Sequence, residues 1–290
     1  MNKQTKVWLV ISIALSLLAL GAACGGSKTP ATNEPAADAG ATAYSGPTGT
    51  ISGVISFNGT PPAPKKIDTT ADPVCGQKNP NLMTDDTVVK DGKLANVFVY
   101  VKEGTVDGGK KVADYAWPTP TAAAKLDQNG CHYAPHVMGV QVNQKISITN
   151  SDATQHNIHP TPKLNREWNK TQSAGQGPIE ESFARAEVLI PVKCNQHPWM
   201  KAYIGVLRHP LFAVSSDAGA YEIKGVPPGK YTVVAWREGQ TPEEKPMEVT
   251  VTANGSAKAD FAFGSGAATT STAPSLQMMP AIEFPMITKR

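Results

Sequence analysis

The sequence has few charged residues and only one long hydrophobic run. Charged side chains make up 18% of the 290 residues, against about 25% in an average protein. The 27 basic and 24 acidic residues form no dense basic cluster, which argues against a nucleic-acid-binding surface. Beyond residues 7–20, no stretch is long and apolar enough to span a bilayer. Small polar residues, 25 glycines and 24 prolines fill the composition instead, a mixture typical of short strands and turns.

The hydrophobic run at the N-terminus has the features of an export signal. Lys3 and Lys6 precede the apolar residues 7–20, and small residues follow. As a helix this run would reach about 21 Å, short of the ~30 Å hydrocarbon core of a bilayer. We therefore predict a secretory signal peptide over residues 1–23.

The cysteine directly after these small residues resembles the lipid-acceptor position of bacterial lipoproteins. The resemblance implies cleavage before Cys24, a lipid on its thiol, and a membrane-anchored protein that faces the periplasm or the cell surface. Plain secretion with a free Cys24 is the alternative. Residues 24–48 and 265–290 are rich in Gly, Ala, Ser and Thr, which predicts a flexible lipid-anchored linker and a disordered tail.

Between these tails the pattern is that of β-structure. Apolar and polar residues alternate around residues 51–57 and 97–101, as in strands with one buried face. Two further pairs of alternating segments flank turn residues, and we predict hairpins around Asn143 and Asn254. No segment has the pattern of an amphipathic helix. The predicted class is all-β, with two sandwiches.

Two segments resemble parts of carboxypeptidase regulatory-like (transthyretin-like) domains. GTISGVISFNGTPPAP at 49–64 is similar to their opening strand, and DAGAYEIKGVPPGKYTVVAWREG at 217–239 is similar to their central hairpin. The resemblance implies a small, non-catalytic β-sandwich. Neither segment alone has enough strands to close a core. One parse is a single sandwich split into 49–111 and 210–264, with another domain inserted over 112–209; two separate domains in tandem are the other.

A soft set of metal ligands occurs in the inserted segment. In EVLIPVKCNQHPWM, strand alternation directs Cys194 into the core, and His197 and Met200 follow at intervals of three. A thiolate, an imidazole and a thioether in one short loop suit copper, which tolerates a weak axial thioether. A second imidazole lies upstream in SDATQHNIHP, where His156 and His159 compete.

These two motifs resemble those of the type 1 (blue) copper family, the cupredoxins. The Cys-x2-His-x2-Met spacing, with Pro198 after the histidine, resembles the ligand loop of amicyanin-like and plastocyanin-like proteins. The stretch GVQVNQKISITNSDATQHNIH resembles the family segment that ends in the first histidine ligand, and Asn157 after that position favours His156 over His159. The resemblance implies a cupredoxin Greek-key sandwich over 112–209. It implies one type 1 copper ion with the ligands His156, Cys194, His197 and Met200.

The resemblance also implies a function. In the family the histidine of the ligand loop exposes its ring edge through an apolar patch, and here that surface comprises His197, Pro198 and Trp199. Expected partners are periplasmic redox proteins such as c-type cytochromes, or a membrane oxidase. No acid, base or open coordination position is evident, so we expect a one-electron carrier and not an enzyme. The rival hypotheses are a lipoprotein that stores, delivers or senses copper, and a scaffold lipoprotein without a metal.

Other metal chemistry fits less well. Zinc is disfavoured because methionine is a poor zinc ligand and no second cysteine lies near Cys194. Covalent haem needs Cys-x2-Cys-His, which is absent. His136 is a ligand candidate on spacing alone or a strand-edge histidine, and His132 and His209 are interpreted as structural or exposed.

The four cysteines are expected to have different roles. With Cys24 assigned to lipid and Cys194 to copper, Cys75 and Cys131 remain. One disulfide between them is expected in an oxidising compartment, and it would tie the N-terminal segment to the start of the copper domain. Two free buried thiols are the alternative.

Overall fold

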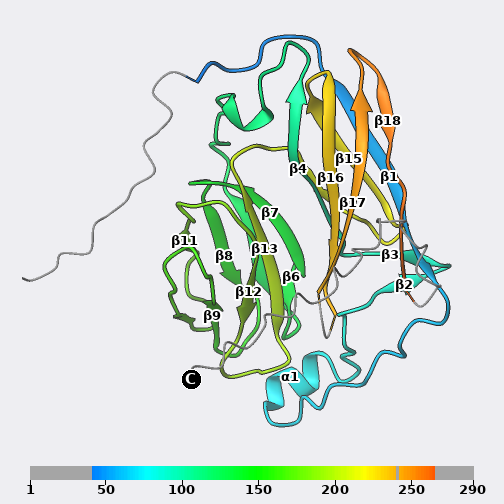
Figure 1. The fold of residues 1–290 in the computed structure, drawn as a ribbon. Coiled ribbons are helices and arrows are strands. Elements are labelled where there is room, and N and C mark those ends of the chain that lie inside the picture. The colour runs from blue at the N-terminus through cyan, green and yellow to red at the C-terminus, as the bar shows by residue number, and fades with distance from the viewer. Residues whose placement is uncertain (1–40, 240–241, 265–290) are drawn as a thin grey trace, which may run out of the picture. The chain divides into compact units, whose positions relative to one another are not determined.

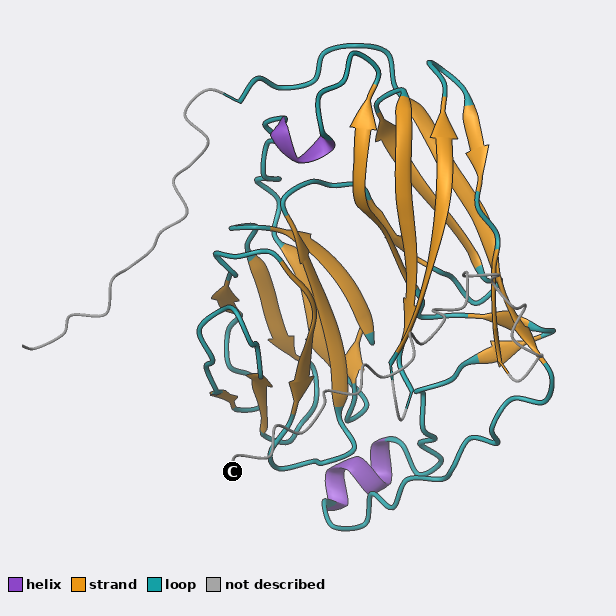
Figure 2. Ribbon diagram, in the orientation of Figure 1, coloured by secondary structure: helices purple, strands orange, loops and turns teal. Residues whose placement is uncertain are grey.

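The computed structural model describes residues 41–239 and 242–264, and nearly all regular structure in these ranges is β-strand (Figure 1, Figure 2). The predicted all-β class is confirmed. The described helical elements are α1 (Pro73–Lys78) and a 3-10 turn (Val112–Asp114). Neither could cross a bilayer. The predicted signal peptide, Cys24, the first part of the linker and the C-terminal tail lie outside the described residues.

The strands form four sheets, named A to D here. Sheet A contains β15 (Ala220–Val226), β1 (Gly49–Asn58), β3 (Lys93–Leu94), β2 (Val89–Lys90), β18 (Ser256–Lys258) and β19 (Phe261–Gly264). Sheet B contains β14 (Phe212–Val214), β4 (Phe98–Val106), β16 (Gly229–Arg237) and β17 (Glu243–Val251). Sheet C contains β10 (Lys170–Gln172), β9 (His156–Pro160), β12 (Glu187–Lys193), β13 (Lys201–Leu207) and β7 (Val137–Gln141). Sheet D contains β11 (Ile179–Glu181), β8 (Ile146–Asn150), β5 (Ala124–Gln128) and β6 (Tyr133–Ala134).

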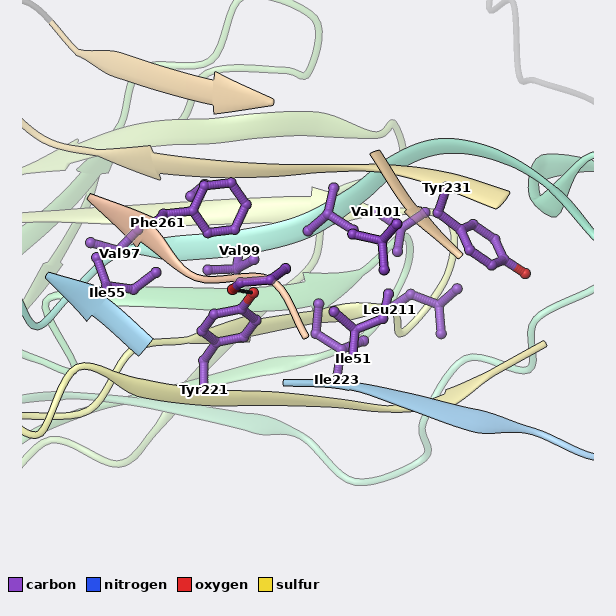
Figure 3. Packing of buried hydrophobic residues seen from close by; sticks show 14 of the residues in the cluster. Ile51, Ile55, Val97, Val99, Val101, Leu211, Tyr221, Ile223, Tyr231 and Phe261 are labelled. Atoms are coloured by element: carbon purple, nitrogen blue, oxygen red, sulfur yellow. Dashed lines mark hydrogen bonds between the residues drawn. The ribbon is translucent and has the colours of Figure 1, made fainter. Parts of the chain in front are cut away.

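Sheets A and B enclose the first hydrophobic core (Figure 3). Along β1 buried and part-buried residues alternate, and Ile51, Ile55 and Phe57 all lie on the buried face, as the sequence predicts. They pack in one cluster with residues of β4 such as Val99 and Val101. Sheets C and D enclose a second core of the same kind.

The first half of β4, residues 98–101, is buried on both faces, because sheet B also packs against sheet C. Val99 and Val101 face the first core, whereas Phe98 and Tyr100 join a third cluster with residues of β7, β12 and β13. The Phe98 ring approaches the backbone of β13 so closely that a Cβ atom at Gly205 would lie 2.4 Å from it. Glycine in β13 is therefore a requirement of this packing.

The two predicted hairpins are wrong. Strands β7 and β8 flank the turn at Asn143 but belong to sheets C and D, and strands β17 and β18 flank Asn254 but belong to sheets B and A. Both turns exist, with asparagine at positive φ. Each turn carries the chain across a core from one sheet to the facing sheet, so the flanking strands do not pair.

Sheets A and B draw their strands from two separated parts of the sequence. Strand β1 pairs antiparallel with β15 and parallel with β18 and β19, and β4 pairs with β16. All strands of sheets C and D lie between residues 124 and 207. The two sheets that enclose the second core are therefore local in the sequence.

A buried histidine ties sheet B to the loop before β7. His136 donates from Nε2 to Glu238 Oε2 at 2.6 Å, and its Nδ1 lies 3.2 Å from Asp85 Oδ2. The Tyr203 hydroxyl donates to the other oxygen of Glu238 at 2.9 Å. Burial opposes protonation of His136, but the two carboxylates outweigh it and raise its pKa to about 9.

This raised pKa predicts that stability falls with rising pH. Below the unfolded pKa of about 6.5 both states carry the proton, and between about 6.5 and 9 only the folded state keeps it. The free energy of unfolding should fall by on the order of 3 kcal/mol across this window. Urea titrations between pH 6 and 10 measure the slope. His136→Gln should remove most of it, and an equally steep slope in that variant would contradict the assignment.

Candidate metal centre

Three potential ligands converge in the second core. His156 is the first residue of β9, Cys194 directly follows β12, and His197 lies in the loop between β12 and β13. Their donor atoms all lie within 4.8 Å of one another, and all three residues are buried. The Nδ1 atoms of the two rings are 2.9 Å apart, and Cys194 Sγ is 3.8 Å from His197 Nδ1.

Strand pairing brings the distant histidine to the loop. Strands β9 and β12 are antiparallel neighbours, with His159 opposite Lys193. Beyond β12 the chain turns tightly: Cys194 N donates to Met200 O at 3.2 Å, and Met200 N donates to His197 O at 2.9 Å. Met200 is fully buried and packs in the same hydrophobic cluster as Cys194.

Asn157 joins the two segments that carry the ligands. Its Oδ1 accepts from Asn195 N at 2.8 Å and lies 3.3 Å from Cys194 Sγ. Its backbone oxygen accepts from the Tyr133 hydroxyl at 2.5 Å. The asparagine after His156 therefore ties β9 to the backbone of the residue that follows Cys194, which gives a physical reason for the predicted motif.

The metal-free site is a buried ion pair at neutral pH. Burial opposes ionisation of Cys194, but hydrogen bonds from His156 and from backbone amides outweigh it and lower the thiol pKa to about 6. Burial also opposes protonation of His156, but Asp152 and Cys194 outweigh it and raise the imidazole pKa to about 9. Cys194 is thus already the thiolate that binds metals, and ligation at His156 requires loss of one ring proton.

The donor set fits copper. One thiolate, two ring nitrogens and a neighbouring thioether are the ligands of a His₂Cys site with a weak axial methionine. The two facing Nδ1 atoms share one hydrogen bond between them, and each ring has its outer nitrogen on a carboxylate, as is usual for metal-binding histidines. The arrangement can therefore hold a soft metal ion without rearranging the ring orientations.

No family model and no curated protein matches the chain. Among solved structures, a mutant of amicyanin in its oxidized state is 20% identical and covers 30% of this chain and 84% of its own, with a TM-score of 0.27. The novel purple cupredoxin from Nitrosopumilus maritimus is 19% identical over 29% of this chain and 98% of its own, with a TM-score of 0.25. The copper-containing nitrite reductase from Thermus scotoductus SA-01 is 18% identical over 29% of this chain, which spans 22% of the reductase, with a TM-score of 0.27.

The expected exposed edge of His197 is wrong. The residue is 4% exposed, because its outer nitrogen Nε2 lies 3.1 Å from Asp72 Oδ2, at the start of α1. Trp199 packs on the ring, with centroids 5.1 Å apart, and is half-buried, whereas Pro198 is exposed. Solvent therefore reaches this surface at Pro198 and Trp199 and hardly at the histidine.

The disulfide between Cys75 and Cys131 is present and lies beside the site. Cys75 Sγ is 3.8 Å from His197 Nε2, so the bridge holds α1 over the ring. Cys194 is the free cysteine in the described part of the chain. Of the two alternatives open from the sequence, the structure has the bridge.

The remaining histidines lie outside the donor group. His159 Nε2 is 2.6 Å from Glu167 Oε1, and its Nδ1 is 3.0 Å from Asn195 Oδ1. His132 is half-buried near a backbone carbonyl. His209 is buried, and burial lowers its pKa to about 4.

Sequence reasoning missed the two carboxylates at the outer nitrogens, Asp72 and Asp152. Asp72 precedes a proline, and Asp before Pro is a helix-start signal, so α1 could have been found. Nothing in the sequence links that helix to a histidine 125 positions later. Asp152 lies four residues before His156 with no feature that separates it from other acidic residues.

Proposed function

We propose that the protein is a type 1 copper protein that carries single electrons. One observation supports this above all: a thiolate and two imidazoles meet in a buried site with a methionine in the same loop. Bound copper would supply the Cu(I)/Cu(II) couple. Cys194 would bind as the thiolate, and His156, His197 and Met200 would be the other ligands.

The chain supplies rigidity and exclusion of water. The Cys194 sulfur is held between Asn157 and the turn of the ligand loop, and both rings are fixed through their outer nitrogens. Fixed donors lower the reorganisation that accompanies a change of oxidation state. A cavity of about 680 Å³ is lined by Pro198 and Trp199 but by none of the four ligand candidates. The site therefore suits a carrier better than an enzyme that binds substrate at the metal.

The same proposal includes a membrane anchor, redox partners and a division of the chain into domains. A lipid on Cys24 would anchor the protein to a membrane, and residues 24–48 would let the copper domain reach periplasmic c-type cytochromes or a membrane oxidase. We propose the split parse, with a regulatory-like sandwich over 49–111 and 210–264 around a cupredoxin domain over 112–209. The shared sheet formed by β1, β15 and β19 supports it.

Copper storage, delivery or sensing is the second candidate. The observation in its favour is the cover over His197, which closes the ring edge through which related carriers are expected to exchange electrons. Under this proposal the protein would transfer its copper ion to an acceptor, and it would not transfer electrons.

Voltammetry and stopped-flow mixing with a reduced c-type cytochrome separate the two. A carrier should show a reversible one-electron wave and oxidise the cytochrome without losing copper. A storage protein should exchange electrons slowly and release copper to a chelator. The zinc-loaded protein is the control, since it keeps the fold and has no accessible redox couple. An irreversible wave together with rapid copper release would reject the carrier proposal.

A further inference from the structure

Both candidate histidines make a hydrogen bond to a carboxylate on the side away from Cys194. His156 Nε2 lies 2.9 Å from Asp152 Oδ2, and His197 Nε2 lies 3.1 Å from Asp72 Oδ2. A carboxylate only accepts, so each ring donates from Nε2. In His197, and in His156 once it has lost its Nδ1 proton, this leaves the lone pair on Nδ1, which points at the donor group.

Asp152 is held by four donors. Its side chain is fully buried and accepts from Gly130 N at 2.7 Å, from Cys131 N at 2.8 Å and from His156. Lys78 Nζ, from the end of α1, completes the set at 2.7 Å from Oδ1. Because these donors fix the position of the Asp152 carboxylate, the carboxylate determines the orientation of the His156 ring.

Asp72 is held by the helix that it caps. Its Oδ1 accepts from Val74 N at 2.8 Å and from Cys75 N at 3.2 Å, the usual bonds of a helix N-cap. Its Oδ2 accepts from the Thr154 hydroxyl at 2.8 Å as well as from His197. Among the described residues, the ion-pair partner of Asp72 is His197, and no lysine or arginine lies within ion-pair distance of it.

The disulfide links the two carboxylate–histidine pairs. Cys75 N donates to Asp72 and Cys131 N donates to Asp152. Each half-cystine therefore supplies an amide to one carboxylate, and the covalent bond between the sulfurs sets the distance between the two.

We propose that Asp72 and Asp152 are positioning residues for the metal ligands His197 and His156. This inference rests on the proposed copper site and adds a preference for its oxidation state. A carboxylate that accepts from a ligand imidazole fixes the tautomer and makes the ring a stronger donor. Its negative charge stabilises the ion of higher charge more, so Cu(II) gains more than Cu(I) and the reduction potential is lowered.

Asp72 allows a sharp test because two substitutions keep its cap. Asn and Ser cap helices about as well as Asp. Asp72→Asn removes the charge, and with its one side-chain oxygen on the helix amides it turns its NH₂ group, which is a donor, towards His197. Asp72→Ser keeps the cap and is too short to reach the ring. Asp68→Asn is the matched control, since within the described part of the chain the Asp68 side chain accepts hydrogen bonds from Thr70 and does not contact His197.

Competition titrations on the full-length protein measure Cu(II) and Cu(I) affinities separately. Asp72→Asn should lower Cu(II) affinity about tenfold and Cu(I) affinity clearly less. A tenfold difference between the two corresponds to a rise of about 59 mV in midpoint potential for a one-electron couple. Asp68→Asn should match the wild type. Equal losses for both ions, no loss, or the same effect in Asp68→Asn would overturn the inference.

Nitrogen NMR of the metal-free protein gives a readout that needs no copper. His197 should be the Nε2–H tautomer in the wild type, and that tautomer should lose population in Asp72→Asn and in Asp72→Ser, because neither side chain presents an acceptor to Nε2 while it caps the helix. An unchanged tautomer in Asp72→Ser would overturn the positioning role. If the wild type binds no copper, the proposed function fails, whereas the NMR result still decides whether the carboxylate orients the ring.

Discussion

Replacing Cys194 with serine is expected to abolish the colour of the copper-loaded protein. The intense visible band of a type 1 site is charge transfer from thiolate to Cu(II), and a serine oxygen cannot supply it. Cu(II) affinity should fall by more than about 100-fold, because loss of a ligand exceeds the roughly 10–100-fold cost of losing an outer partner. Copper titration followed by visible absorption measures both effects.

The fold should survive this substitution. Cys194 is buried directly after β12, and a serine side chain is small enough to fit there, with its hydroxyl able to donate to Asn157 Oδ1. His159→Gln is the control, because His159 lies outside the donor group and should leave the band intact. A band that persists in Cys194→Ser would reject the proposed ligand. No band in the wild type at stoichiometric copper would favour a scaffold without a metal.

Removing the disulfide should have the largest effect on stability. Cys75 and Cys131 are separated by 56 residues, and in the chain-entropy model a loop of that length contributes about 4 kcal/mol. The double variant Cys75→Ser, Cys131→Ser should lose about that much free energy of unfolding, measured in urea without copper or reductant. The cover over His197 should loosen as well, since this bridge fixes α1 to the segment that precedes β6.

Two measurements test whether the Cys75–Cys131 disulfide stabilises the fold. Cys194→Ser keeps the bridge and should stay close to the wild type in the same urea titration. Thiol counting on denatured, metal-free protein that begins after Cys24 should find one reactive cysteine. Three reactive cysteines, or a loss of stability below about 1 kcal/mol in the double variant, would contradict the structural role.

The convergence of the candidate ligands could be predicted because most of them are close in the sequence. Cys194, His197 and Met200 occupy one seven-residue loop, so their spacing alone indicates a common site. The choice of His156 over His159 rested on the following asparagine, and the structure shows Asn157 bonded to the ligand loop. Strand geometry agrees, because His159 points away towards Glu167.

The cover over the site was not predictable from the same signals. Asp72 contacts His197 across 125 positions, and no periodicity or spacing records a contact at that range. The pairing of the strands could not be predicted from the sequence for a related reason. Alternation shows which face of a strand is buried but not which strand lies beside it, so the turns at Asn143 and Asn254 were interpreted as hairpins when both cross a core.

The pairing of β1 has a consequence for how the molecule is made. Its neighbours in sheet A include β18 and β19, at the far end of the described chain. During synthesis from the N-terminus, a strand whose alternate residues are apolar must wait about 200 residues for those neighbours. Such distant contacts slow folding and leave edges open to association. The strands between 124 and 207 pair only with one another, so we expect sheets C and D to fold first and sheet A to close last.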